Sequence, residues 1–300
     1  MKIDDIAAFA AVVRHHSLSL AAHALGLTQP MLTRRVQGFE QALGVVLLDR
    51  ATKPLQPTAQ GLRVYEQCCA VLREVDSLRE LAGAEPPLTG GLRLGLTQGI
   101  GELVLPALLA ELEARWPGLE PHACTGWGGP LLERLERREL DATAVFLPRG
   151  KPLPRNVEGR MLLRTRLVVV ARKGAWARRS YRLADCQGAG WVLNPDGCGF
   201  RAGLQRALAE RGLPLEVRLD AFGRDLQLYS VAQGLGLGLV PLPLLEGSRH
   251  AAQLQTVPVS DFKPEVELWL AHGPLPERLR EPVACFAQRV EAALAAPVAA

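Results

Sequence analysis

The sequence has few cysteines, and they lack the spacing of a metal site or a disulfide framework. Of the six, Cys68 and Cys69 are adjacent, while the others are scattered, with no CxxC pair and no Cys/His ligand spacing: Cys124, Cys186, Cys198 and Cys285. We therefore expect no metal site and no cofactor. Most of the thiols are expected to be small buried hydrophobic groups in a reducing compartment.

Long hydrophobic runs are also missing. The apolar stretches "LVLPALLA" and "GLGLGLVPLPLL" are far shorter than the roughly 20 residues that span a bilayer. The first residues carry Asp4 and Asp5 rather than a basic segment followed by an apolar one, so no export signal is expected. The pattern predicts a cytoplasmic protein without membrane contact, and it counts against a periplasmic solute-binding protein.

Catalytic signatures and a strong charge of one sign are absent as well. There is no GxSxG, HExxH or GxxxxGKS motif, and "GLGLGLV" lies at an expected strand rather than at a strand-to-helix turn, so we expect no enzyme. The formal net charge is only +4. Its distribution is more informative, because residues 28–63 hold five basic residues against two acidic ones, which favours nucleic acid as a partner.

Two short helices are expected before residue 26. In residues 3–14, Ile6, Phe9, Ala10 and Val13 recur at helical spacing and form one apolar face. Ser17 or Ser19 can cap a second helix. The buried side expected for that helix consists of Leu20, Ala21, Ala24 and Leu25. Gly26 then allows a tight turn.

A third helix is expected from Thr28, a favourable N-cap, to Leu43, with Gly44 ending it and Pro30 in its first turn. Its apolar face is Leu32, Val36, Phe39 and Leu43, and its opposite face presents Gln29, Thr33, Arg34 and Gln37. Two helices joined by a glycine turn, the second presenting polar groups near its start, are typical of a helix-turn-helix that reads a major groove.

A wing is expected after this motif. The sequence predicts a strand over Val45 to Leu48, then a loop, then Thr58 as the cap of a long helix. Arg50 and Lys53 would contact the DNA backbone, and Gln56 the minor groove. The predicted DNA-contacting residues are Thr28, Gln29, Pro30, Met31, Thr33, Arg34, Arg35, Gln37, Arg50, Lys53 and Gln56.

The long helix carries two neighbouring apolar stripes. One is Val64, Cys68, Val71, Val75, Leu78 and Ala82, and the other is Leu62, Tyr65, Cys69 and Leu72. One stripe would face the core of its own domain and the other a partner helix, which predicts a dimer. A single core helix of a monomer is the alternative that the pattern leaves open.

These residues together closely resemble the N-terminal signature of LysR-type transcriptional regulators. The matching positions are Phe9, Ser17, Ala21, Ala22, Leu25, Gln29, Pro30, Thr33, Arg34, Val36, Glu40, Leu43, Gly44, Leu47, Arg50, Thr58 and Gly61. The resemblance implies a winged helix-turn-helix, a linker helix that pairs subunits as a homodimer or homotetramer, and an effector-binding domain shaped like a periplasmic binding protein. One departure is His16, where Gly is usual, which is either a phosphate contact or a surface loop residue.

The rest of the chain alternates strand-like and helix-like segments after a Pro/Gly-rich stretch at residues 83–91. The alternation favours parallel strands with crossover helices in two lobes around a cleft. The expected fold is thus α+β and multidomain. Its parts are a DNA-binding domain over 1–58, a linker helix over 59–83, a hinge over 84–91 and an effector domain over 92–300. The resemblance implies that the end of the chain returns to the first lobe, so that lobe 1 would take about 92–163 and 265–300, and lobe 2 about 164–264.

Loops at the expected strand ends predict the effector site. The candidates are Thr97, Gln98, Gly99, Ile100, Gly126, Trp127, Asn194, Pro195, Asp196, Phe200 and Phe222. The alternative for each residue is that it only shapes a turn. Residues 160–182 hold eight basic residues and no acid. We interpret this segment as a solvated or interdomain face. If one of its arginines pointed into the cleft, a carboxylate effector would be favoured.

The predicted function is therefore regulation of transcription: binding of double-stranded operator DNA, controlled by a small molecule in the cleft. Two alternatives remain. The first is a redox-responsive regulator of the same fold, because Cys198 begins an expected helix, where a thiolate is stabilised. A disulfide would need a second thiol, and Cys186 is the only one near Cys198 in the sequence. The other is a small-molecule binding protein without a DNA function.

Overall fold

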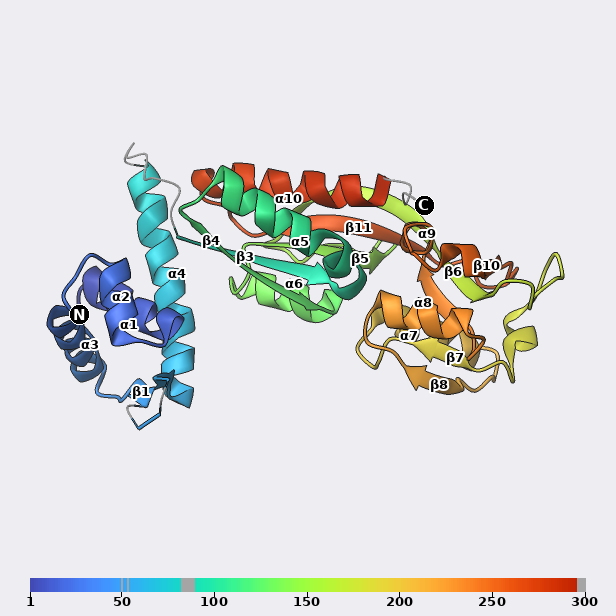
Figure 1. The fold of residues 1–300 in the computed structure, drawn as a ribbon, viewed down its shortest axis with the longest axis horizontal. Helices are drawn as coiled ribbons and strands as arrows, with labels where there is room; N and C mark the ends of the chain where they lie inside the picture. The colour runs from blue at the N-terminus through green and yellow to red at the C-terminus, as the bar shows by residue number, and fades with distance from the viewer. Residues whose placement is uncertain (50, 53, 82–89, 296–300) are drawn as a thin grey trace. The chain divides into compact units, whose positions relative to one another are not determined.

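The chain forms two compact units, Met1–Pro86 and Pro87–Ala300, in a computed structural model that describes residues 1–49, 51–52, 54–81 and 90–295 (Figure 1). The predictions for Arg50, Lys53 and most of the 84–91 hinge lie outside the described residues. Each unit is described by itself below.

The first unit is a small helical domain with a two-stranded wing. Its elements are α1 (Ile3–His15), α2 (Leu18–Ala24), α3 (Gln29–Leu43), β1 (Leu48–Asp49), β2 (Gln56–Pro57) and α4 (Ala59–Leu81). Ser17 caps α2, since its hydroxyl accepts a hydrogen bond from the Leu20 amide at 3.3 Å. The rings of Phe9 and Phe39 pack 5.6 Å apart and join α1 to α3.

Several apolar positions were assigned to the wrong face of their helix. Leu20, Ala24 and Leu25 of the α2 region are exposed, and so is Leu43 at the end of α3. The helix α2 has only seven residues, and it packs through Ala21 and Ala22, which are buried, so Leu20 is turned to solvent. The predicted strand at Val45 begins only at Leu48, with Val46 exposed.

The long helix α4 divides its apolar residues differently from the prediction. Val64, Tyr65 and Leu72 pack against the core of the first unit, and Cys68 is buried in it. Val71 and Leu78 are exposed. The residues that face the core therefore come from both predicted stripes. Leu62, near the start of the helix, is also exposed, so each stripe has members that do not face the core.

The second unit is a mixed α/β fold. Its strands are β3 (Gly90–Thr97), β4 (Leu119–Gly126), β5 (Ala142–Pro148), β6 (Glu158–Arg172), β7 (Trp191–Leu193), β8 (Val217–Asp220), β9 (Gly238–Pro241), β10 (Leu254–Val257) and β11 (Glu265–His272). Its helices are α5 (Gln98–Arg115), α6 (Gly128–Glu136), α7 (Gly199–Ala209), α8 (Arg224–Ala232), α9 (Leu242–Glu246) and α10 (Glu277–Ala295).

Two lobes share the long strand β6. The sheet order is β10-β6-β11-β5-β3-β4, and β9 also pairs with β6. Residues Glu158–Arg166 of β6 pair with β11, and from Leu167 onward the strand pairs with β9 and β10. We call the part with β3, β4, β5, β11, α5, α6 and α10 lobe 1, and the part with β7 to β10 and α7 to α9 lobe 2. Figure 1 shows α5 and α10 on one face of the lobe 1 sheet and α6 on the other.

The expected parallel sheet is only partly present. Strand β3 pairs in parallel with β4 and β5, and β7 pairs in parallel with β8. The crossing strands β6 and β11 run antiparallel to their neighbours, and the short elements β10 and α9 were not predicted. Among the described residues, no helix combines the length and apolar character needed to cross a bilayer.

Candidate functional site

The amino end of α3 is open to solvent in the first unit. Thr28 caps the helix, its hydroxyl accepting from the Met31 amide at 3.4 Å. The helix buries Leu32, Val36 and Phe39. Its exposed side presents Gln29, Pro30, Met31, Arg34 and Gln37. This arrangement offers an amide, a guanidinium and the positive end of a helix dipole on one accessible surface, as a helix that enters a DNA groove requires.

Three predicted contact residues already have internal partners. Ser19 Oγ donates to Gln29 Oε1 at 3.0 Å, which leaves the Gln29 amide nitrogen available. Thr33 Oγ1 donates to the Gln29 carbonyl at 2.9 Å. Arg35 pairs with Asp4 of α1, 3.3 Å between Nη2 and Oδ2. Arg35 therefore ties α3 to α1, and its guanidinium is less available to DNA than that of Arg34.

The wing is anchored by groups that the sequence analysis did not assign to it. One carboxylate oxygen of Glu40, on α3, accepts from the amides of Leu47 at 2.8 Å and Leu48 at 3.2 Å. Thr58 Oγ1 donates to the Val46 carbonyl at 3.1 Å. Gln56 lies half-buried on β2 opposite Asp49. One sign of this role is present in the sequence: Glu40 is the acidic residue on a helix whose other charged residues, Arg34 and Arg35, are basic.

His16 ends α1 in a left-handed conformation, with φ of 49°. Its ring nitrogen Nδ1 lies 3.2 Å from the Leu55 carbonyl, so the tautomer with a proton on Nδ1 donates to the loop before β2. The exposed imidazole thus contacts the wing loop. This contact explains a histidine in this position without a contact to a DNA phosphate.

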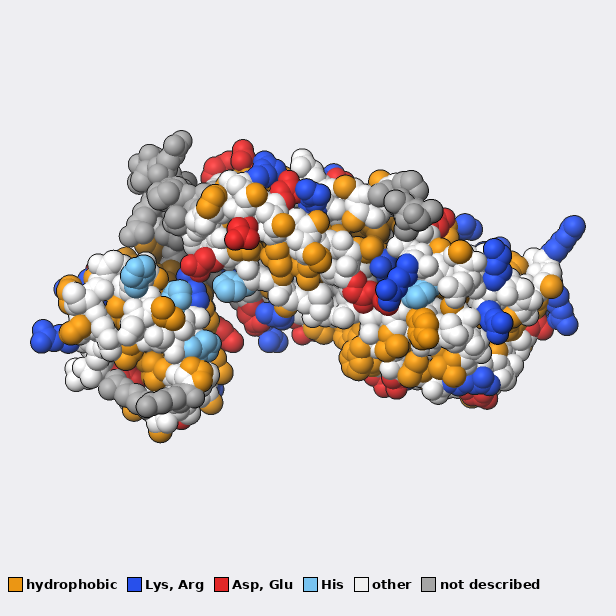
Figure 2. Space-filling view, viewed as in Figure 1, with side chains coloured by type: hydrophobic (Ala, Val, Ile, Leu, Met, Phe, Trp, Pro, Cys, Tyr) orange, Lys and Arg blue, Asp and Glu red, His pale blue; other side chains and the backbone are white. Residues whose placement is uncertain are grey.

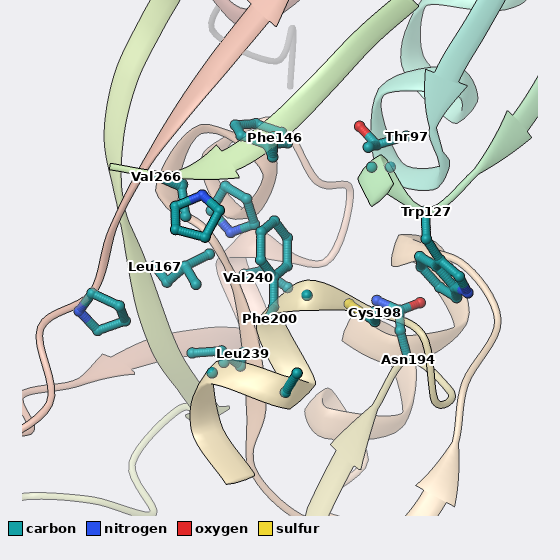
Figure 3. A pocket seen from close by; sticks show the side chains of 18 of the residues that line it. Thr97, Trp127, Phe146, Leu167, Asn194, Cys198, Phe200, Leu239, Val240 and Val266 are labelled. Carbon is teal, nitrogen blue, oxygen red and sulfur yellow. The ribbon is translucent and has the colours of Figure 1, made fainter. Parts of the chain in front are cut away.

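A cavity of about 400 Å³ lies between the two lobes of the second unit. Six predicted effector residues line it: Thr97, Gln98, Gly99, Trp127, Asn194 and Phe200. Figure 3 shows Trp127 beside Asn194 and Cys198 on one side of the space, while Phe146 lies on the other side with Phe200 near it. The two phenyl rings make an edge contact at 5.9 Å between centroids.

The other five predicted residues lie outside this lining. Ile100 is fully buried in the core on the inner face of α5. Gly126 ends β4 beside Leu131. The Pro195 carbonyl accepts from the Cys198 amide, and Asp196 pairs with Arg201 at 3.0 Å. Phe222 is 69% exposed, and Leu226 and Tyr229 of α8 are exposed as well. Figure 2 shows hydrophobic side chains gathered on the surface of lobe 2.

Sequence reasoning missed most of the apolar wall. Phe146 comes from the end of β5, Leu239 and Val240 from β9, and Leu167 and Val266 from the two crossing strands. The residues on β5 and β9 could have been found, because the same strand-end rule applies to them. The residues on the crossing strands could not, since Leu167 lies within β6 and Val266 near the start of β11, at positions that the strand-end rule does not cover.

Among the described helices, four begin at the cavity, and the start of α8 at Arg224 is capped by the Glu102 carboxylate, whereas the other three have no side-chain cap. The lining includes the first residues of α5, α6 and α7, which are Gln98, Gly128 and Gly199. Within the described chain, the N-cap residues Thr97, Trp127 and Cys198 make no side-chain capping hydrogen bond that meets normal geometry. The free amides and positive dipole ends of the three helices favour negative charge in the cavity.

Basic residues outnumber acids in the lining. Lys151, Arg206 and Arg224 line the cavity, and among the described lining residues the acid is Glu265, which pairs with Arg149 at 2.5 Å. None of these bases comes from residues 160–182. In that segment Arg160 pairs with Glu291 at 2.8 Å and Arg164 with Glu267 at 2.9 Å, in agreement with a surface role.

Cys198 is the N-cap of α7 and lines the cavity, but its thiol is buried. Burial raises the pKa of Cys198, and this effect outweighs the amides of Arg201 and Phe200, which lower it. The expectation that the helix start would stabilise a thiolate is therefore wrong for this site, because desolvation disfavours the charged form more strongly. Within the described residues, no cluster of His, Cys, Asp and Glu is arranged to hold a metal ion.

Two family models match most of the chain. Residues 86–295 match the LysR substrate binding domain, and residues 3–62 match the bacterial regulatory helix-turn-helix protein, lysR family. The hydrogen peroxide-inducible genes activator of Escherichia coli is 26% identical over 276 residues, which cover 91% of this chain and 90% of that protein.

Solved structures share the whole fold. A full-length OxyR variant from Pseudomonas aeruginosa has a TM-score of 0.72 at 22% identity, covering 97% of this chain and 98% of its own. Full-length CbnR complexed with its target DNA has a TM-score of 0.58 at 20% identity, covering 98% of this chain and 100% of its own. At sequence identities of 20% and 22%, the similarity to these structures establishes a shared fold.

Proposed function

This chain belongs to the LysR-type family of transcriptional regulators, and we propose that it binds operator DNA through the amino-terminal half of α3 while a small molecule in the interlobe cavity controls that binding. The observation that carries the proposal is the combination of an exposed polar face at the start of α3 with a cavity of about 400 Å³ between two lobes. The proposal places the protein in the cytoplasm as a homodimer or homotetramer.

For the DNA contacts, we propose that Gln29, Arg34 and Gln37 read base edges and that Thr28 and the amides of the first turn bind phosphate. Gln29, Arg34 and Gln37 are exposed on α3. Arg35 contributes less, because it is paired with Asp4. Gln56 and the basic residues Arg50 and Lys53 would contact the backbone and the minor groove from the wing.

The test is a selection of genomic fragments by the full-length protein, followed by titrations at several salt concentrations. Replacing Arg34 by Ala should cost about 1–3 kcal/mol on the selected fragment and relax its base preference. Lys53→Ala is the matched control: it should weaken all sequences alike and lower the salt slope by about one. Full specific affinity in the Arg34 variant would overturn the proposed reading helix.

For the effector, the test is a thermal-shift screen of metabolites on the full-length protein, since a ligand that binds the native state raises its melting temperature. A compound that binds should also change the affinity for the selected DNA fragment, because coupling between two sites is reciprocal. Phe200→Ala should weaken such a compound, since the ring lies in the cavity wall. If no compound stabilises the protein, cavity binding loses its support.

A redox-responsive regulator is the second candidate, favoured by relatives whose names include hydrogen peroxide. The buried Cys198 thiol, with its raised pKa, argues against that residue as the sensor. The decisive comparison is DNA binding with and without hydrogen peroxide in the native protein and in Cys198→Ser. A peroxide response that disappears in the variant would favour the redox candidate over effector control.

A further inference from the structure

Arg224 has a poorly satisfied buried guanidinium at the edge of the cavity. It is the first residue of α8 and lines the cavity, and its side chain is only 13% exposed. The Nε atom is buried and has no hydrogen-bond acceptor in the described part of the chain, while Nη1 donates a long hydrogen bond, 3.4 Å, to the Gly247 carbonyl. A guanidinium has five N–H donors, and a buried donor without an acceptor is costly.

The nearest opposite charge is only partly available to Arg224. Glu102, on α5 of lobe 1, lies 3.7 Å from the Arg224 Nε through its Oε2. The same carboxylate already caps α8, because Oε1 accepts from the Arg224 amide at 2.8 Å and Oε2 from the Asp225 amide at 3.3 Å. Burial lowers the pKa of Arg224 against the opposing effect of Glu102 and Asp225. The side chain is therefore a cation whose charge is incompletely compensated.

The space beside Arg224 suits an anion with an apolar body. Most of the wall is hydrocarbon, including Phe146, Phe200 and Val240 (Figure 3). The uncapped starts of α5, α6 and α7 add positive potential, and Glu265 in the lining is neutralised by Arg149. A hydrophobic wall with a small number of charged groups is the usual composition of a site that orients an amphipathic ligand.

We propose that the effector is a small organic acid with an apolar body, whose carboxylate pairs with Arg224, and that Glu102 competes with it as an internal counter-ion. This rests on the proposed function, because it assigns a ligand class and a specificity-determining residue to the same cavity. A carboxylate pairs with a guanidinium through charge-assisted hydrogen bonds, which are stronger than those between neutral groups. The Nε of Arg224 has no acceptor in the described chain and Nη1 has only the long bond to Gly247, so the guanidinium keeps donor capacity that Glu102 does not use.

The competition has a structural basis in the contact between the lobes. Glu102 comes from lobe 1, while the amides it caps belong to lobe 2. Gly223, with φ of 92°, makes room for it, since a Cβ there would lie 2.4 Å from the Glu102 carboxylate. An effector carboxylate that takes Arg224 leaves Glu102 on the α8 amides alone. The ligand therefore changes one of the three contacts that connect α5 to α8 through this carboxylate.

The test uses the full-length protein and four acids, each with its primary amide: benzoate, phenylacetate, 3-phenylpropanoate and octanoate. Binding is measured by calorimetry and by thermal shift. We expect acids to bind and their amides to bind at least about 10-fold more weakly, since a hydrogen bond to a charged group is worth about one to two factors of ten. Arg224→Gln should weaken the acids by about 10- to 100-fold and leave the amides unchanged.

Two further variants isolate the competition. Glu102→Gln keeps an oxygen for the α8 amides but removes the negative charge, so acids should bind several-fold more tightly. Arg249→Gln is the control, because Arg249 is 73% exposed, pairs with Asp225 near the same helix start and does not line the cavity. It should leave binding of both ligand series unchanged. Unliganded melting temperatures report whether each variant is folded.

The outcomes separate the two proposals. Amides that bind as tightly as acids, or acids that bind equally well to folded Arg224→Gln, overturn the acid assignment and leave the cavity as a small-molecule site. Weaker acid binding in Glu102→Gln overturns the competition. If neither acids nor amides bind, the acid assignment falls together with the support for an effector cavity.

Discussion

Gly61 lies where a side chain has no room, at the junction of the wing and α4. It is the third residue of α4 and is buried. A Cβ built there would lie 2.0 Å from the Leu47 carbonyl oxygen and 3.0 Å from the Leu47 carbonyl carbon. The obstacle is backbone, and it is held by the hydrogen bond from the Thr58 amide to the same oxygen at 2.9 Å. No rotation of a side chain can relieve the contact.

We therefore expect Gly61→Ala to destabilise the first unit. Overpacking costs typically about 1–3 kcal/mol, and the upper end applies here because the Leu47 carbonyl oxygen, 2.0 Å from the Cβ, must retreat to about 3.4 Å for ordinary contact. A loss of about 3 kcal/mol lowers the protection of the slowest-exchanging amides about 100-fold. The displaced carbonyl adjoins β1, so DNA affinity should fall as well.

Gly38→Ala is the matched control. Gly38 lies within α3, and a Cβ there would meet nothing within 4 Å. In a helix interior, alanine is favoured over glycine by roughly 0.5–1 kcal/mol. The same loss of freedom in the unfolded chain affects both variants, so the contrast between them reports the contact with Leu47.

The assay is hydrogen exchange on α1 and α3 in the full-length protein, with calorimetry as a second measurement. We expect lower protection in Gly61→Ala and equal or higher protection in Gly38→Ala. Wild-type protection in Gly61→Ala would refute the reasoning, because it would mean that the wing and α4 can separate at no cost.

Two other predictions concern the second unit and the thiols. Burial by itself raises the pKa of Asp261, but the hydrogen bonds from the Leu183 amide and Arg211 outweigh burial, so the pKa lies below its usual value. The ionised Asp261 therefore stabilises the fold fully above a pH of about 4, and this stabilisation is lost as the pH falls through the pKa of the folded state. Asp261→Asn should lower the melting temperature of the second unit near neutral pH and lose that difference in acid; a constant difference would contradict this. Burial raises the pKa of Cys186 to about 11, so iodoacetamide at pH 8 should label it slowly, after the partly exposed Cys69 and Cys124. Mass spectrometry of labelled peptides checks the order, and rapid labelling of Cys186 would contradict it.

Local rules determined the helices of the DNA-binding domain. Thr28, Gly44 and Ser17 are capping residues whose effect depends on their immediate neighbours, so the ends of α2 and α3 followed from the sequence. Burial was less well predicted, as Leu20 and Leu43 show. A short apolar helix has more than one possible buried face, and only packing against α1 and α3 decides between them.

The effector cavity shows the same division. Strand-end loops predicted Thr97, Trp127 and Asn194 in its lining, because the ends of parallel strands meet at one edge of a sheet. Leu167 and Val266 were out of reach, since their place depends on how β6 and β11 cross between the lobes. The sequence indicated no special role for Arg224.

By itself, the sequence determined most of the longer helices and strands and the side chains at their ends, since these depend on neighbours a few residues away. Only the tertiary structure decided that Glu102 and Arg224, far apart in the chain, meet at the edge of one cavity. A charge buried between two lobes depends on long-range packing for its partner, its solvent exposure and therefore its chemistry.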